Sequence, residues 1–164
     1  MHGLSTDAGR AQAHGWRLLP AEHGHAGLGP APLRALATIP GLGVTTAGVL
    51  LASLPLDRLQ TARQPTAYVG LCPQERSSGS SIRGHGSIGA LGPSCVRKSL
   101  YLPAIVAIRC NPALRVFAER LRAKGKRPKV VITVVMRKLL VLAWTLLRTG
   151  QSFSPVHHLQ LAGA

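Results

Sequence analysis

The residues best suited to chemistry lie in a Gly/Ser-rich basic segment, Tyr68 to Arg97, with the sequence YVGLCPQERSSGSSIRGHGSIGALGPSCVR. Glycines in this segment let backbone N–H groups turn outward, and such groups bind anions together with arginine side chains. The segment therefore favours a phosphate-bearing partner. A flexible polar loop with a basic rim has the same composition, so the rest of the chain must decide between the two. The serines are Ser77, Ser78, Ser80, Ser81 and Ser87.

The overall charge favours a nucleic acid as that partner. The chain has 164 residues, of which 46% are hydrophobic, enough for one compact domain. It carries 20 Lys and Arg against 5 Asp and Glu, a formal charge of +15. Such a chain repels itself unless a polyanion supplies counter-charge. A basic membrane-surface protein is disfavoured, because aromatic anchors are scarce at 4%.

The sequence lacks the residue patterns of a two-metal catalytic site, a zinc site and a membrane span. The five acidic residues are scattered, whereas two-metal phosphoryl transfer needs several that converge. The three cysteines have no CxxC spacing, which fits reduced thiols in a cytoplasm and predicts no metal site. No signal peptide is visible, and two cations, Arg137 and Lys138, interrupt the longest apolar run. The sequence predicts no membrane span.

The glycine run from Gly84 to Gly89 formally matches GxGxxG, but no strand is predicted before it and no acidic residue follows at the required distance. A dinucleotide site is therefore disfavoured. His85 could act as a base for a nearby serine, yet no carboxylate is placed in sequence to orient it. A hydrolase triad is disfavoured as well.

The chain begins with residues 1–32, rich in Gly, Ala and His, which predict a disordered leader. Residues 33–54 then predict a helix-hairpin-helix around Pro-Gly-Leu-Gly. The amides of Gly41 and Gly43, with the start of the next helix, could face a DNA phosphate. An ordinary αα-hairpin also uses such glycines. The charge of the chain favours the DNA interpretation.

Further helices are expected on both sides of the serine loop, here residues 72–94. They cover about residues 61–71, 95–110, 112–124 and 129–149, the third capped by Asn111 and the last stopped by Gly150. Residues 154–164 are expected to form a C-terminal tail outside the domain. No sustained period-two alternation is present. The predicted fold is all-α: a helix-hairpin-helix, a Gly/Ser-rich loop and a small helical bundle.

Taken in order, the motifs resemble the C-terminal transposase domain of bacterial insertion-sequence transposases of the IS-one-ten and IS-eleven-eleven group. The matching pieces are TIPGLGVTTAGVLLA, ARQPTAYVGLCPQERSSGSSIRGHGSIGALG, VRKSLYLPAIVAIRCNPALRVFAERLRAKGK and VVMRKLLVLAWTLLRTGQSF. They extend over about residues 33–153. The order and spacing of these pieces are more specific than any one of them.

The resemblance implies a DNA transposition enzyme in which a serine attacks a DNA phosphate. That serine corresponds to Ser78 before Gly79, with Ser77 as the alternative register. An N-terminal RuvC-like domain supplies acidic metal ligands in this family, so Mg²⁺ is expected only with such a partner domain and no cofactor is expected in this chain. A structured guide RNA is a further implied partner. Candidate DNA-binding residues are Gly41, Gly43, Arg76, Gly79, Arg83, Arg97 and Lys98.

Two departures from the family pattern limit what the resemblance implies. Gly89 and Ala90 replace a polar Ser-Lys pair, and the residues before Leu33 do not resemble the acidic RuvC-like half. The expectation is a truncated copy that binds duplex DNA in the cytoplasm, at the nucleoid, pairs with itself or a full-length transposase, and is inactive alone. The alternatives are a non-catalytic nucleic-acid-binding remnant and a basic RNA-binding protein.

Overall fold

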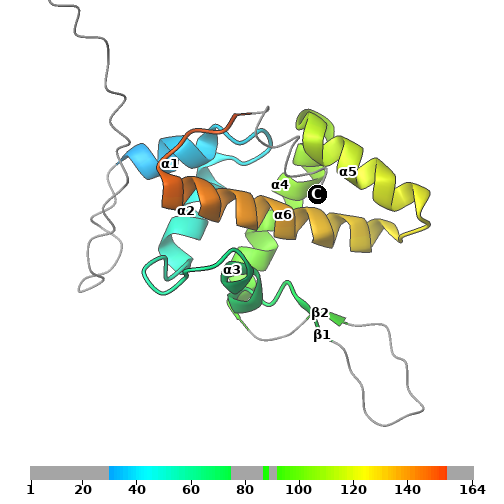
Figure 1. Ribbon diagram of the computed structural model, residues 1–164, viewed down its shortest axis with the longest axis horizontal. Helices are drawn as coiled ribbons and strands as arrows, with labels where there is room; N and C mark the ends of the chain where they lie inside the picture. Colours follow the sequence, from blue (N-terminus) through cyan, green and yellow to red (C-terminus); the bar gives the residue numbers. More distant parts are fainter. Residues whose placement is uncertain (1–29, 75–86, 89–91, 155–164) are drawn as a thin grey trace, which may run out of the picture.

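The computed structural model describes residues 30–74, 87–88 and 92–154, and within these ranges the fold is helical (Figure 1). The predicted all-α class is confirmed. One short antiparallel pair was not expected: Pro73 lies opposite Ile88, and Gln74 opposite Ser87. The elements are α1 (Pro30–Ala37), α2 (Val44–Ser53), α3 (Arg63–Tyr68), β1 (Pro73–Gln74), β2 (Ser87–Ile88), α4 (Ser94–Cys110), α5 (Pro112–Ala123) and α6 (Pro128–Thr149).

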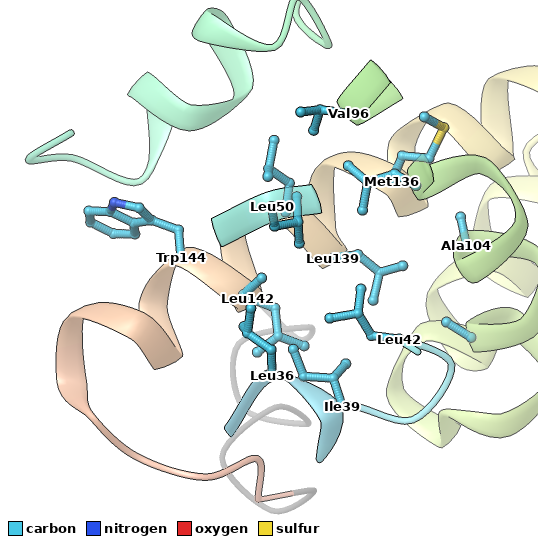
Figure 2. Packing of buried hydrophobic residues seen from close by; sticks show 14 of the residues in the cluster. Leu36, Ile39, Leu42, Leu50, Val96, Ala104, Met136, Leu139, Leu142 and Trp144 are labelled. Atoms are coloured by element: carbon cyan, nitrogen blue, oxygen red, sulfur yellow. The ribbon is translucent and has the colours of Figure 1, made fainter. Parts of the chain in front are cut away.

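Helix α6 forms the centre of the fold, and α1, α3, α4 and α5 pack against it (Figure 1). It starts with Pro128, which has no N–H to leave unpaired, and stops at Gly150, whose φ of 69° is left-handed. Leu36, Ile39 and Leu42 from the α1–α2 region share one apolar cluster with residues of α6 (Figure 2). The sequence predicted both ends of α6 to within one residue.

Helix α6 is also long and apolar enough, by length and composition, to cross a membrane. Its mean hydropathy is 2.1 over the most apolar stretch. In the folded chain 56% of that stretch is buried among the other helices, as expected for the core helix of a globular domain. Its burial is therefore explained without a lipid bilayer.

The junction between α4 and α5 is a sharp corner of 97° built around Asn111. The Asn111 side-chain oxygen accepts hydrogen bonds from the N–H groups of Ala113 (3.1 Å) and Leu114 (3.3 Å). Pro112 occupies the first helical position. The predicted asparagine cap is confirmed, and the proline adds a favourable helix start. They allow two helices to follow one another with no intervening loop.

Helix α5 is amphipathic. Leu114 and Ala118 are buried, while Phe117 and Leu121 pack against the edge of the core. Its basic residues face solvent: Arg115, Arg120 and Arg122, with Lys124 at the C-cap. Because the apolar stripe faces α4 and α6, the opposite face of α5 presents only polar, charged or isolated apolar side chains.

The boundary of the predicted leader at residue 32 is wrong for its last residues. Pro30 to Pro32 form the first turn of α1, and the side chain of Pro32 is buried. Proline fits the first turn of a helix because the first N–H groups have no intrahelical partner. Residues 1–29 and 155–164 lie outside the described residues.

Helix α3 is shorter than the predicted residues 61–71. It ends at Tyr68 because Gly70, with φ of 73°, turns the chain away. The connection that precedes α3 is attached to the core, since the Trp144 indole N–H donates to the Leu59 carbonyl at 3.3 Å. Helix α3 is thus held between α6 and the entry to the serine loop.

Candidate nucleic-acid interface

The serine loop leaves the helical body through a narrow base. The β1–β2 pair joins Gln74, the last described residue before the loop, to Ser87, the first one after it. The predicted nucleophile Ser78, its alternative Ser77, and Arg76, Gly79 and Arg83 lie in residues 75–86, outside the described residues. The structure therefore describes the two ends at which residues 75–86 join the helical body, Gln74 and Ser87.

Arg97 holds the two sides of that base together. Its Nη1 donates to the Val69 carbonyl at 2.8 Å and to the Gly92 carbonyl at 3.2 Å. Val69 follows α3 and Gly92 precedes α4, so one guanidinium connects the chain before the loop to the chain after it. A guanidinium presents several donors in a fixed plane, which suits it to bridging carbonyls. Arg97, which the sequence suggested as a DNA ligand, thus forms hydrogen bonds within the protein itself.

Gly92 is required by the same close approach. A Cβ at this position would lie 2.1 Å from the Tyr68 carbonyl oxygen, and φ is +96°. Any side chain at this position would push apart the end of α3 and the chain just before α4. The sequence suggested only that glycines here free backbone amides. The tertiary contact gives Gly92 a second, steric reason that no local pattern reveals.

Lys98, another predicted DNA ligand, is exposed on the first turns of α4. Its neighbour Arg97 is half-buried, so the adjacent cations differ in access to a ligand. Helix α4 starts at Ser94 without a side-chain cap among the described residues. Unpaired N–H groups at a helix start favour anions, as does a nearby lysine. Lys98 is accessible to a phosphate.

The two glycines of the α1–α2 turn are in different environments. Leu42 N–H donates to the Ile39 carbonyl at 3.0 Å, and Gly41, with φ of +97°, takes the position of this turn that favours glycine. A Cβ on Gly41 would lie 2.7 Å from the Ala107 backbone of α4. The turn is therefore packed tightly on α4 at Gly41.

Gly43, in contrast to Gly41, is not packed against another element. It is exposed, a Cβ there would meet nothing within 4 Å, and it forms the N-cap of α2 with no side-chain hydrogen bond. Only Gly43 of this pair has the open backbone that a phosphate contact needs. DNA contact at this turn, and the helix-hairpin-helix role, stay predictions.

Three basic side chains of α4 and α5, those of Arg109, Arg115 and Arg122, line a groove of about 550 Å³ between α4, α5 and α6. Arg115 donates from Nη2 to the Arg109 carbonyl, which ties the two helices together at their corner. Glu119 supplies one negative charge in this groove, which is lined by Ile105, Ile108, Arg109, Arg115, Glu119, Arg122 and Ile132.

Metal ligands are not clustered in the part of the chain that the structure describes: no three His, Cys, Asp or Glu side chains come together there. Cys72, Cys95 and Cys110 are free thiols. Cys72 Sγ lies 3.5 Å from Thr66 Oγ1, at the loop entry, and Cys95 Sγ lies 3.8 Å from Ser53 Oγ. These residues do not fit an Mg²⁺ site, which needs oxygen ligands arranged around the ion.

The comparison with protein families places the chain among insertion-sequence transposases. Residues 33–119 match the family described as "Transposase IS116/IS110/IS902 family". The match extends from the second turn of α1 through most of α5 and includes the whole base of the serine loop. The chain belongs to this family, and the resemblance expected from the ordered motifs is confirmed.

Individual relatives agree with this assignment. The chain is 38% identical over 125 residues to the pilin gene-inverting proteins of Moraxella bovis and Moraxella lacunata. It is 33% identical over 117 residues to a 43.6 kDa protein of insertion element IS110 from Streptomyces coelicolor. These alignments cover 75% and 70% of this chain but 39% and 28% of the relatives' lengths. The chain spans less than half of these relatives.

Proposed function

We propose that this chain is the serine-bearing, nucleic-acid-binding part of a DNA transposase, and that Ser78 is its nucleophile. Membership of a transposase family over residues 33–119 is the observation that carries the proposal. Relatives named for pilin gene inversion support action on DNA, since inversion of a gene rearranges DNA strands. The base closed by Arg97 supports a loop presented at a defined place on the body.

In the proposed step, the Ser78 hydroxyl oxygen forms a bond to a DNA phosphorus and a deoxyribose oxygen leaves with the electrons of the broken P–O bond. A serine hydroxyl is a weak nucleophile, so a base must accept its proton. Cationic groups must also stabilise the additional negative charge on the phosphoryl oxygens. Arg76 and Arg83 are the candidates beside Ser78 in sequence, and Lys98 is the accessible cation at the start of α4.

The general base that accepts the serine proton and the metal ion are both expected from outside the described residues. Mg²⁺ bound by a RuvC-like partner domain would supply charge neutralisation at the phosphate. The partner would be such a domain, a full-length transposase or a second copy of the chain. A guide RNA and a cytoplasmic, nucleoid-associated location belong to the same proposal.

The test is covalent trapping. The chain is incubated with nicked duplex DNA and Mg²⁺, with and without an added RuvC-like domain, and denatured samples are separated by mass. The proposal predicts a DNA-linked band that depends on the added domain and is absent from Ser78→Ala. Ser77→Ala is the matched control and should keep the band. Equal adduct from Ser78→Ala would exclude Ser78.

The second candidate function is a non-catalytic nucleic-acid-binding remnant. It is favoured by one observation, the formal charge of +15, because a strongly basic chain can bind a polyanion without cutting it. Under this function the chain binds duplex DNA and yields no adduct even with the added domain. A basic RNA-binding protein would instead prefer structured RNA when RNA and duplex DNA compete.

A further inference from the structure

A pocket of about 370 Å³ lies between α3 and α6. One wall comes from Ala62, Arg63 and Thr66, and the other from α6. The α6 residues are spaced by three and four positions, so they share one helix face. They are Val134, Arg137, Lys138 and Val141.

The pocket combines unneutralised cations with apolar walls. Neither Arg63 nor Arg137 makes a side-chain hydrogen bond or an ion pair with another described residue. The two acidic residues in the described ranges lie elsewhere: Asp57 pairs with Arg58, and Glu119 lines the other groove. Arg137 is half-buried on the most buried helix of the fold. Partial burial of a cation is unfavourable unless an anion joins it.

Lys138 is less available than the two arginines. Its ammonium lies 4.7 Å from the centre of the Phe117 ring on α5, a distance typical of a cation–π contact. Its aliphatic stem can still line the pocket. The anion should therefore contact Arg63 and Arg137, while Lys138 contributes mainly apolar surface and long-range charge.

We propose that this pocket binds one nucleotide of a single-stranded segment, with the phosphate on Arg63 and Arg137 and the base or sugar against Val134 and Val141. The volume is at the lower end of the range for small-molecule sites, about 300–1,000 Å³, and suits one unstacked nucleotide better than a duplex. Single-stranded nucleic acids combine cationic contacts with apolar or aromatic platforms in this way.

The position of the pocket relates it to the serine loop. Arg63 and Tyr68 are the two ends of α3, a helix of six residues that is about 9 Å long. Thr66, which lines the pocket, contacts Cys72 at the loop entry, and the carbonyl of Val69 is held by Arg97. A nucleic-acid strand that contacts the loop entry, at Val69 and Cys72, would need only a few nucleotides to reach the pocket. The inference therefore deepens the proposed function and rests on it.

The test uses the full ¹⁵N-labelled chain and four probes: 5′-phosphorylated dT6, 5′-phosphorylated rU6, thymidine and a hexaglutamate peptide. Amide NMR shifts are followed during titration. Both oligonucleotides, or one of them, should shift the amides of the residues that line the pocket. Thymidine should bind much more weakly because it lacks the phosphate. The ratio of dT6 to rU6 affinity identifies which nucleic acid the pocket prefers.

Matched variants separate the pocket from general charge. The double variant Arg63→Gln/Arg137→Gln should lower oligonucleotide affinity by roughly tenfold or more and flatten its salt dependence. Arg120→Gln on the exposed face of α5 should have little effect. Arg63→Lys/Arg137→Lys should recover part of the affinity, and unfolding curves should confirm that each variant is folded.

Three results would overturn the inference. The first is that oligonucleotides leave the pocket amides unshifted. The second is that Arg120→Gln loses as much affinity as the pocket variant. The third is that hexaglutamate produces the same shifts and affinity as dT6, which would identify an acidic-peptide site. Duplex DNA binding, measured in parallel, separates this failure from that of the proposed function: the pocket can fail while duplex DNA still binds.

Discussion

At the scale of single residues, the structure distinguishes amino acids that the sequence treats alike. Gly41 and Gly43 belong to one Pro-Gly-Leu-Gly turn, but only Gly41 has positive φ and approaches the α4 backbone. Arg97 and Lys98 are adjacent cations, but only Arg97 bridges two carbonyls at the base of the loop. Each pair therefore offers a variant and its matched control.

The glycine pair gives the first prediction. Gly41→Ala should lower the free energy of unfolding by about 2 kcal/mol or more, because the new Cβ is both strained and in contact with the Ala107 backbone. Gly43→Ala should cost only about 0.5 kcal/mol, since alanine is a slightly poorer N-cap and space is open there. Urea unfolding measures both. Equal losses would contradict the tight packing of Gly41 on α4.

The adjacent cations Arg97 and Lys98 give the second prediction. Arg97→Ala should lower the free energy of unfolding by about 1–3 kcal/mol, because two carbonyls at the loop base lose a charged donor. Hydrogen exchange at the Gly70 and Leu71 amides should accelerate as the base loosens. Lys98→Ala should leave both properties nearly unchanged while weakening DNA binding. If Lys98→Ala loosened the base as much, Arg97 would not be its specific link.

At the scale of elements, the fold is organised by the ends of its helices and by one central helix. Asn111 caps α5 while ending α4, and this residue produces the corner that exposes the basic face of α5. Helix α6 supplies buried side chains to contacts with α1, α3, α4 and α5. Changes at these two places should act on the whole domain, since the packed elements depend on one another.

The cap gives the third prediction. Asn111→Ala should destabilise the chain by about 1 kcal/mol or more, because two N–H groups at the start of α5 lose their acceptor. Asn111→Ser should recover much of that loss, since a serine oxygen can accept the same bonds. Thermal unfolding of the three proteins measures the order. A serine variant no better than alanine would show that Asn111 acts through packing.

The hydrophobic core gives the fourth prediction. Leu139→Ala removes a fully buried side chain from the middle of α6 and should cost about 2–5 kcal/mol. Val130→Ala, at an exposed position on the same helix, should cost less than about 0.5 kcal/mol. Denaturant unfolding compares the two. A small loss at Leu139 would be inconsistent with α6 as the core helix.

At the scale of the whole molecule, the sequence predicted what depends on local signals. The Asn111 cap at the start of α5 and the Gly150 stop at the end of α6 indicated these helix ends closely, because such signals act within a few residues. The bridge from Arg97 to Val69 and Gly92, and the contact of Gly41 with Ala107, join residues far apart in the chain. The pocket between α3 and α6 likewise exists only after folding. No periodicity encodes such contacts.

The distribution of charge gives the fifth prediction. With a formal charge of +15, binding to duplex DNA should weaken steeply with salt, with a log–log slope of about −0.9 for each phosphate neutralised. Fluorescence anisotropy over a range of NaCl concentrations measures this slope. Affinity that does not change with salt would show that phosphate contacts do not drive binding.

The identity of the nucleophile is tested most directly by mass spectrometry of the trapped DNA adduct. Trypsin cuts after Arg76 and Arg83, so one peptide, SSGSSIR, carries both candidate serines, Ser77 and Ser78. After nuclease digestion of the DNA, fragmentation of this peptide locates the residual nucleotide. The added mass is expected on Ser78 and should be absent from Ser78→Ala. Added mass on Ser77 or on a different peptide would contradict it.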